Sequence, residues 1–402
     1  MKKEKNENYE EQIKEIFELK DIVWFLIGMA VPFLWNLIKT IFQTMRMRRK
    51  IKKGDMEFAD KSIVSLAHGD PFFSNNNGKQ ELRLDAPREV FYISMPEDIK
   101  NQILENKPNF FNTRWEKEEV FLDGRTEEEM LAEIAGVLGL TVEETKEIYL
   151  EEKVNVAKFF LEKAKSGAPY FNGEMYGIKK FNDNRDGEFE RPGVDIHSYK
   201  TDYYTHRVMA AIYRRVYKSN PGIAPENNPE SFNKMRYFLT SMGMNVLLYL
   251  KDEGKIVFAK RSGKLVNMSK PLWHVSMNEA ISITDISESN GTIDLEKCIV
   301  RGLNEELGLD DKIINIDYSD VFFLKDPLET GISAFVTVNN RSFSDLKILY
   351  SAAKDRELES EDLVTVKLNS MALNDFMKKN ELTDAAQYLI KMLLARHIKG
   401  SI

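Results

Sequence analysis

The sequence contains a single cysteine, Cys298, in 402 residues. One thiol excludes an intrachain disulfide and a cysteine-rich zinc site, and it fits a protein that works in a reducing compartment. Internal repeats and low-complexity tracts are also absent from the sequence. The formal net charge is only -7, and hydrophobic residues make up 43% of the chain, enough for buried cores. The length predicts an anchoring segment plus two globular units.

Long apolar runs are scarce, and the one present covers 22–45. As a helix this run would be about 36 Å long, enough to cross a hydrocarbon core of about 30 Å. A basic cluster follows it, comprising Arg46, Arg48, Arg49, Lys50, Lys52 and Lys53. The positive-inside rule then predicts a single-pass protein with its C-terminal region in the cytoplasm. No small-residue cleavage site supports a signal peptide. Pro32 and Lys39 leave open a buried helix or a helix lying in the membrane plane.

The composition divides the chain into segments with different predicted structures. The predicted fold class is α/β, with an N-terminal transmembrane helix, a mixed α+β middle region and a C-terminal α/β/α sandwich. The predicted boundaries are 1–21 for a charged N-terminal segment, 22–45 for the transmembrane helix, 46–57 for a basic juxtamembrane segment, 58–220 for the mixed region, 221–236 for a linker and 237–402 for the sandwich.

The middle region carries regular elements but little recognisable chemistry. Strand patterns cover 89–95, 175–181 and 194–199, and helical patterns cover 126–140, 141–165 and 201–217. The helices at 126–140 and 141–165 each open with a capping box, formed by Thr126 with Glu129 and by Thr141 with Glu144. Their junction resembles a helix-turn-helix. The acidic residues around it would face DNA phosphates with the wrong sign, so we expect no DNA partner.

The helix at 201–217 is rich in aromatic and basic residues. Two interpretations remain open: these side chains line a nucleotide pocket by stacking and phosphate contact, or the aromatic residues belong to a core and the arginines to a solvated face. The residues concerned are Tyr203, Tyr204, His206, Arg207, Arg214 and Arg215.

The richest pattern is the stretch 294–309, which predicts an amphipathic helix. Leu295, Ile299 and Leu303 recur at helical spacing and should form its buried face. A glycine at 308 can end the helix in the left-handed conformation. Glu305 and Glu306 place two negative charges in the last turn, against the helix dipole. We therefore expect a cation there, either the arginine at 301 or a divalent metal ion.

The sequence RGLNEELGL at 301–309 resembles the second half of the Nudix box, which ends Arg-Glu-hydrophobic-x-Glu-Glu-x-Gly-hydrophobic. Eight of these nine positions match, and Gly302 stands where the family has a glutamate. The first half of the box is absent, since its glycine and glutamate would fall at Ser287 and Ile293. A glutamate at 302 would point toward the same cation as Glu306, unless packing requires the glycine. Taken alone, the stretch could also be an ordinary amphipathic helix with an acidic end.

The flanking elements fit the same family. A hairpin is predicted at 244–260, further strands at 320–324 and 331–338, and a closing helix at 384–397. The resemblance implies a Nudix-like α/β/α sandwich with Mg²⁺ bound by Glu305, Glu306 and Glu359, of which the first two would be catalytic. Glu357 and Glu361 are alternatives for the third metal ligand, or the segment 354–362 is a solvated charge run. Ligand-binding roles are implied for Arg261, Trp273 and Arg301.

A membrane segment joined to an incomplete Nudix box resembles the transmembrane Nudix effectors of cyclic-oligonucleotide antiphage signalling (CBASS). The resemblance implies a bacterial inner-membrane protein that binds a nucleotide or cyclic oligonucleotide, and whose apolar helix rearranges or forms homo-oligomers to perturb the membrane. A membrane-tethered, Mg²⁺-dependent hydrolase of a nucleoside diphosphate derivative is the alternative function. A scaffold with an inert Nudix fold is the third.

Overall fold

The structure is a computed structural model that describes scattered positions between 31 and 49 and the ranges 62–65, 81–112, 118–168, 170–186, 191–226, 228–262, 271–309, 313–326 and 328–399. After β1 (Ile63–Ser65), the first half of the described chain consists of β2 (Glu81–Leu84), β3 (Glu89–Val90), α2 (Glu97–Asn106), β4 (Phe111–Asn112), α3 (Glu127–Leu138), α4 (Val142–Lys165), β5 (Asn172–Asp186), β6 (Arg191–Asp202), α5 (Tyr203–Ser219) and α6 (Pro229–Lys234).

The second half consists of β7 (Met242–Leu250), β8 (Lys255–Arg261), β9 (Trp273–His274), β10 (Met277–Ala280), α7 (Leu295–Leu307), β11 (Ile313–Lys325), β12 (Leu328–Val338), α8 (Phe343–Ser351), α9 (Arg356–Glu359), β13 (Ser360–Lys367), α10 (Ser370–Lys379) and α11 (Asp384–Lys399). Short 3-10 turns lie at Leu122–Gly124, Pro221–Ile223 and Ile283–Asp285.

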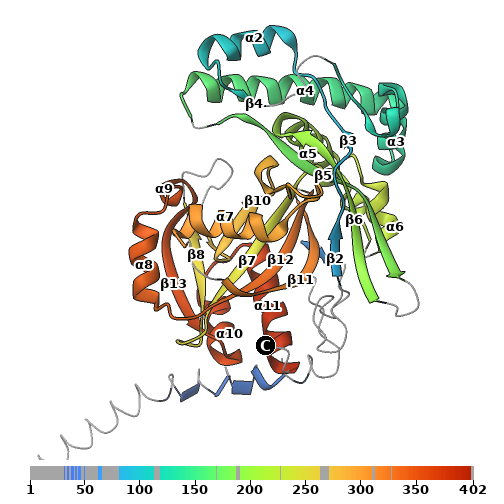
Figure 1. Cartoon of the computed structure of the whole chain (residues 1–402). Coiled ribbons are helices and arrows are strands. Elements are labelled where there is room, and N and C mark those ends of the chain that lie inside the picture. Colours follow the sequence, from blue (N-terminus) through green and yellow to red (C-terminus); the bar gives the residue numbers. More distant parts are fainter. Residues whose placement is uncertain are drawn as a thin grey trace, which may run out of the picture.

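Two sheets organise the described chain (Figure 1). The first half has strand order β2-β6-β5-β4, with β3 also paired to β6. The second half has order β1-β11-β12-β7-β8-β13, with β10 added beside β7 and β9 beside β8. Strands β7 and β12 run parallel, while the other pairs of this second sheet are antiparallel. The parallel pair brings the starts of β7 and β12 to the same edge of the sheet.

The second sheet is buried on both faces. Along β7, Met244, Val246 and Leu248 belong to a core with α7 and α8, whereas Leu247 and Tyr249 pack into a separate core with α10 and α11. Side chains alternate between the faces of a strand, so a nearly continuous apolar strand needs a covering layer on each side. This half is therefore the α/β/α sandwich predicted from the sequence, in the arrangement that the Nudix resemblance implies.

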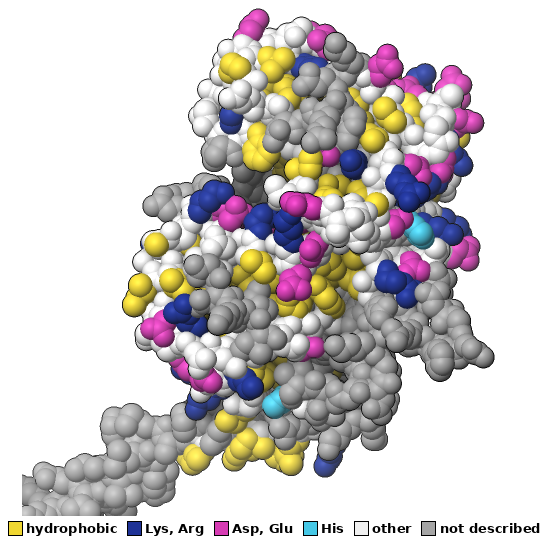
Figure 2. Space-filling view, viewed as in Figure 1, with side chains coloured by type: hydrophobic (Ala, Val, Ile, Leu, Met, Phe, Trp, Pro, Cys, Tyr) yellow, Lys and Arg dark blue, Asp and Glu magenta, His cyan; other side chains and the backbone are white. Residues whose placement is uncertain are grey.

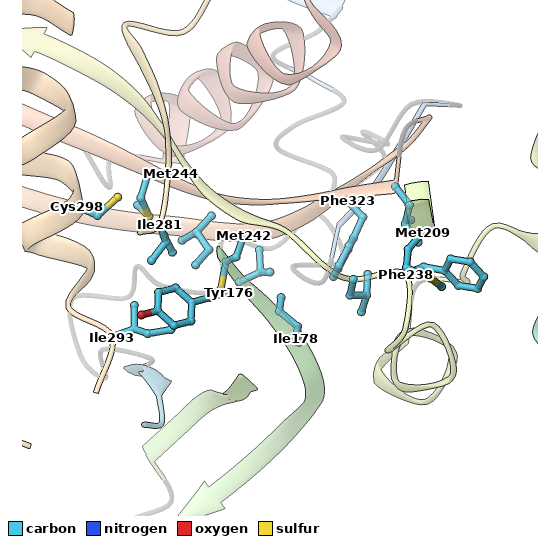
Figure 3. Close-up of a cluster of buried hydrophobic side chains, with 14 of the residues drawn as sticks. Tyr176, Ile178, Met209, Phe238, Met242, Met244, Ile281, Ile293, Cys298 and Phe323 are labelled. Carbon is cyan, nitrogen blue, oxygen red and sulfur yellow. The ribbon is translucent and has the colours of Figure 1, made fainter. Parts of the chain in front are cut away.

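One hydrophobic core runs through both halves. Tyr176 and Ile178 of β5 and Met209 of α5 lie in the same buried cluster as Met242 of β7 and Phe323 of β11 (Figure 3). The backbone N–H of Ile178 also donates to the carbonyl of Leu239, 2.7 Å away, just before β7. Strand β1, which precedes the first half, pairs with β11 of the second sheet. The two halves are therefore held together by shared packing, and the predicted division at 221–236 stays a prediction.

Most local predictions for the middle region are confirmed. Both capping boxes are formed, at Thr126 and at Thr141. The strand predicted over 89–95 is shorter and ends at Val90. Beyond that point the backbone donors bind different partners: Tyr92 bonds to Val120, and Ile93 donates to the Thr205 hydroxyl at 3.0 Å. With no single partner strand, the apolar run is buried without continuing as a strand.

The predicted transmembrane helix is wrong. Within the described residues, no helix is long and apolar enough to cross a membrane. The described helical positions of this region include Lys39, Arg46 and Arg49, which interrupt the apolar positions. The single-pass inner-membrane location predicted from this helix is corrected with it. Residues 1–30, most of 46–57 and several positions of 31–45 lie outside the described residues.

Candidate functional site

Helix α7 forms as its sequence predicts. Asp294 caps the N-terminus by accepting from the Lys297 N–H at 3.0 Å. Gly308 ends the helix in the left-handed region at φ 67°. Leu295, Ile299 and Leu303 are buried. The helix lies against β10, at the front of the second sheet in Figure 1, and this contact positions the carboxylates of the last turn.

The Glu305 side chain is neutralised by two cations. Its carboxylate accepts from Arg301 Nη1 at 3.1 Å and from Lys354 Nζ at 2.8 Å. Burial tends to raise the pKa of Glu305, but the hydrogen bonds from Lys354 and Arg301 outweigh it and hold the pKa below its usual value. The intrahelical ion pair with Arg301 was one of the two cation partners expected from the sequence. These cations offset the unfavourable position of Glu305 in the helix dipole.

The Glu306 side chain points in a different direction and is only 6% exposed. Its Oε1 accepts from the Asn278 backbone N–H at 3.1 Å. Burial, followed by the negative charges of Glu279 and Glu359, raises its pKa well above the usual value. Within the described part of the chain, Glu306 forms no ion pair. Neighbouring glutamates of the box therefore have opposite environments: Glu305 is ionised and paired, while Glu306 is held toward the neutral form.

Strand β10 supplies a carboxylate that the sequence did not indicate. A Cβ atom at Gly302 would lie 2.9 Å from the Cβ of Glu279 and 2.9 Å from the Sδ of Met277. Glu279 therefore lies beside α7 at the position where the box lacks its glutamate. Burial raises its pKa to about 7, although the charge of Arg301 opposes this shift. The glycine at 302 is explained by the close approach of β10.

Arg301 links three elements. Its Nε and Nη2 donate to the two carboxylate oxygens of Asp285 at 2.9 and 2.8 Å. Its Nη1 donates to Glu279 at 2.9 Å and to Glu305 at 3.1 Å, and Nη2 also donates to the carbonyl of Ala280 at 2.9 Å. A guanidinium has five N–H donors, so protein acceptors use all of them. The ligand-binding role predicted for Arg301 stays a prediction. It would require a ligand to replace one of these protein acceptors.

The other predicted site residues lie at the ends of neighbouring strands. Glu359, at the end of α9, is 3.8 Å from Arg261 Nη2 at the end of β8. Arg261 Nη1 also donates to the Asn278 side chain at 3.2 Å. The ring of Trp273 packs against Phe376 of α10, with ring centroids 5.9 Å apart. Glu361 is exposed, with Lys260 at 3.8 Å. The side chain of Glu357 lies outside the described residues.

The described residues do not group the three carboxylates that the resemblance predicts as magnesium ligands. Within the described ranges, no group of three or more histidine, cysteine, aspartate or glutamate side chains is placed to hold a metal ion. Glu305 is turned toward Arg301 and Lys354, while Glu306 is turned toward β10. Magnesium needs several oxygen ligands in near-octahedral geometry. The metal-binding and catalytic roles of Glu305, Glu306 and Glu359 stay predictions.

A cavity of about 540 Å³, lined in part by Glu279, opens where α5 meets the edge of the second sheet. The wall on α5 includes Tyr203, His206, Arg207 and Arg214, four of the six residues named for the nucleotide-pocket interpretation. The sheet side consists of residues of β7, β8, β9, β10 and β12, among them Asn245, Arg261, His274, Asn278, Glu279, Glu329 and Thr330. Basic and acidic side chains gather at the boundary between the two halves in Figure 2.

Three buried polar atoms in residues that line this cavity have no hydrogen-bond partner among the described residues: Arg261 Nε, His274 Nε2 and Thr330 Oγ1. The other ring nitrogen of His274 lies 2.5 Å from Thr383 Oγ1. Burial lowers the pKa of His274 well below its usual value, so the imidazole is neutral. A buried polar group without a partner costs about 1–3 kcal/mol. A ligand that binds these atoms would recover that cost.

Two further residues of the cavity escaped the sequence interpretation. Glu329, at the start of β12, is half-buried. Burial raises its pKa, while the charges of Arg261, Arg214 and Arg207 oppose the rise. Thr330 follows it on the same strand. Their only sequence signal is polarity at the start of an otherwise apolar strand, which does not show that β12 begins next to β7.

Comparison with known proteins establishes no family for the chain. No family model matches it. No curated protein matches it either.

Among solved structures the chain is similar to DR0079 from Deinococcus radiodurans, with 11% identity, TM-score 0.28 and coverage of 38% of this chain and 82% of that chain. It is similar to Tm1382, a proposed Nudix hydrolase, with 13% identity, TM-score 0.28 and coverage of 38% and 70%. A third similar structure is a bifunctional NMN adenylyltransferase/ADP ribose pyrophosphatase from Francisella tularensis complexed with AMP and manganese, with 12% identity, TM-score 0.27 and coverage of 47% of each chain.

Proposed function

We propose that this protein binds a nucleotide, without a metal requirement, in the cavity between α5 and the edge of the second sheet. The observation that carries the proposal is that three residues lining this cavity, Arg261, His274 and Thr330, each have a buried polar atom with no hydrogen-bond partner among the described residues, beside Arg207 and Arg214. The cavity volume of about 540 Å³ lies within the range of small-molecule sites, about 300–1,000 Å³.

The chemistry of the walls supports a phosphate-bearing ligand with an aromatic base. Arginine binds phosphate through paired N–H groups, and arginines from both halves face the cavity. Tyr203 lines the cavity beside them, with its ring stacked on the His206 imidazole at 5.9 Å and 6.0 Å from the Arg207 guanidinium. Asn278 donates to the Asn245 side chain at 3.0 Å, and the remaining N–H groups of the two amides can bond to the edge of a base. In an antiphage signalling protein, this cavity would sense the nucleotide signal.

Calorimetric titration of the full chain tests the proposal. We expect AMP to bind in the presence of EDTA and adenosine to bind more weakly, because only AMP engages the arginines. Arg207→Ala and Arg261→Ala should each weaken AMP binding by about tenfold or more, since a hydrogen bond to a charged group contributes roughly 1.5–3 kcal/mol. Arg88→Ala, at an exposed position outside the cavity, is the matched control. Absence of AMP binding, or equal affinity in all variants, would refute the proposal.

A second candidate is a Mg²⁺-dependent hydrolase of a nucleoside diphosphate derivative. It is favoured by Glu306, a buried carboxylate that forms no ion pair with the described residues and lies near Glu279 and Glu359. The test is release of phosphorylated product from nucleoside diphosphate sugars and ADP-ribose with magnesium present. Turnover by the wild type that is lost in Glu306→Gln would favour the hydrolase. Absence of turnover together with AMP binding in EDTA would favour the binding function.

A further inference from the structure

A second cavity of about 390 Å³ lies between α4 and α5. Four cationic side chains of α5 line it: Arg207, Arg214, Arg215 and Lys218. The spacings of seven residues from 207 to 214, four from 214 to 218 and three from 215 to 218 bring them to one side of the helix. Small residues, Ala210 and Ala211, line the cavity between them and leave space above the helix.

This second cavity adjoins the first. Both are lined by His206, Arg207, Arg214 and Glu329. The two cavities nevertheless differ in chemistry. Tyr203 and Phe322 line the first, whereas the described residues that line the second are aliphatic or charged apart from the His206 imidazole. The first cavity therefore has aromatic side chains that a base can contact, and the second is suited to a charged group without a ring.

The described residues that line the second cavity include more cations than carboxylates. Its acidic residues among the described positions are Glu152 and Glu329, against four cations. Arg215 pairs with Glu151 at 2.7 Å and with Glu152 at 3.1 Å, and Arg214 pairs with Asp326 at 2.8 Å. These arginines are 42% exposed, and exposed ion pairs contribute little to stability, so a phosphate group can replace them at small cost.

We infer that the ligand is a nucleoside polyphosphate whose phosphate chain passes from the first cavity, beside Glu329, into the cationic cavity between α4 and α5. This inference rests on the proposed nucleotide-binding function and extends it to a subsite formed by the first half of the chain. Arg207 and Arg214 face both cavities and bind the phosphate nearest the nucleoside. Arg215 and Lys218 face only the second cavity and bind the terminal phosphates.

Glu329 controls how much negative charge this path accepts. Its carboxylate lies on the wall common to both cavities, where it opposes a passing phosphate and partly neutralises the arginines. Replacing it with glutamine keeps its size and removes its charge. We therefore expect Glu329→Gln to bind ATP more tightly than the wild type, by about threefold to tenfold, with a smaller gain for AMP.

Titration of the full chain with AMP, ADP and ATP in EDTA tests the inference. The wild type should bind ATP more tightly than ADP, and ADP more tightly than AMP. Lys218→Ala and Arg215→Ala should each weaken ATP binding by about tenfold and leave AMP binding unchanged, because AMP does not reach the second cavity. Lys158→Ala, at an exposed position of α4 that does not line the cavity, is the control.

The outcomes separate this inference from the proposed function. Equal affinity for AMP and ATP, or equal loss of both ligands in Lys218→Ala, overturns the polyphosphate path while nucleotide binding stands. Failure of every nucleotide to bind overturns both. An ATP preference that persists in Lys218→Ala and in Arg215→Ala places the terminal phosphates elsewhere and overturns the assignment of the second cavity.

Discussion

Two adjacent residues of α7 show how a single position changes the chemistry of the box. Gly302 allows β10 to approach the helix, and Arg301 then binds Glu279 of that strand together with Asp285 and Glu305. A glutamate at 302 would occupy the space of the Glu279 side chain. The missing box carboxylate and the tightly engaged arginine are therefore two consequences of the same packing.

Gly302→Ala should destabilise the protein. Its new Cβ would lie 2.9 Å from the Cβ of Glu279, which cannot move without shifting β10, although the flexible Met277 can adjust. Overpacking of this kind costs about 1–3 kcal/mol. Gly136→Ala in α3 is the matched control: no atom lies within 4 Å of its new Cβ, so helix propensity should stabilise it by about 0.5–1 kcal/mol. Urea unfolding measures the free energy of unfolding of both variants against the wild type.

The same experiment with Gly302→Glu tests whether the box can be restored. We expect a larger loss of stability than for alanine, because the added carboxylate would lie beside Glu279 and Glu306. Stabilisation by Gly302→Ala equal to that of Gly136→Ala would show that β10 does not constrain this position. A glutamate there could then point toward the same cation as Glu306, as the sequence predicts in the absence of a packing constraint.

Arg301→Lys should also lower the free energy of unfolding, by about 2–3 kcal/mol. A lysine keeps the charge but cannot serve both oxygens of the fully buried Asp285 while also binding Glu279 and Glu305. Arg125→Lys, whose more exposed pair with Glu133 is 2.7 Å long, should cost about 1 kcal/mol or less. Thermal or urea unfolding that gives similar losses for both variants would contradict the linking role of Arg301.

At the scale of elements, α7 was predictable because its information is local. Its apolar spacing, capping aspartate and terminal glycine all lie within 294–309, and the structure forms each of them. Glu279 was not predictable in the same way. Its relation to α7 depends on β10 pairing with β7, with Glu279 opposite Met244, a contact set by tertiary structure. The Nudix pattern located α7, but it did not indicate that β10 places Glu279 beside Gly302, where the box lacks its glutamate.

The cavity was predictable only in part for a related reason. Tyr203, His206, Arg207 and Arg214 were recognisable as a set because they follow one another on α5. Thr330, by contrast, is brought to the same cavity by the parallel pairing of β12 with β7, where it lies opposite Met242. Strands β8 to β11 lie between β7 and β12 in the chain, and no local sequence pattern indicates that β7 and β12 pair. Polar residues at the ends of separate strands therefore become visible as a site only in the folded chain.

The contact between α7 and β10 should make stability depend on pH. Burial raises the pKa of Glu279 to about 7 in the folded chain, above the unfolded value of about 4.5. The folded state therefore holds this proton more tightly, so ionisation destabilises it, and the contribution of Glu279 to stability falls as pH rises from about 4.5 to 7.

Glu279→Gln should remove this contribution. The difference in free energy of unfolding between Glu279→Gln and the wild type cancels the titrating groups that do not interact with Glu279. Between pH 5 and pH 8, the stability of the variant relative to the wild type should rise by about 1–3 kcal/mol. Urea unfolding at the two pH values measures this shift. A difference that stays constant, or that shifts toward the wild type, would show that Glu279 ionises normally in the folded protein.

At the scale of the whole molecule, the candidate site exists only where the two halves meet. The first half contributes the arginines of α5, and the second contributes Arg261, His274 and Thr330. The same boundary holds a stacked pair of buried rings, Phe232 and Phe323, with centroids 3.9 Å apart. Shared packing of this kind keeps the two walls of the cavity at a fixed distance, as binding by groups on separate elements requires.

The shared core predicts that both halves unfold together. Phe258→Ala removes a fully buried ring on the far face of the second sheet, where it packs against Phe376 with centroids 4.7 Å apart, remote from the first half. Such a truncation costs about 3–5 kcal/mol. If the chain is one cooperative unit, the most protected amides of α3 and α4 in the first half should lose as much protection against hydrogen exchange as those of β7 and β12. Protection that falls only in the second half would show two independently folding units and support the boundary predicted at 221–236.

In that case the cavity would lie between two units that can move apart. Ligand affinity would then depend on how tightly the two units dock.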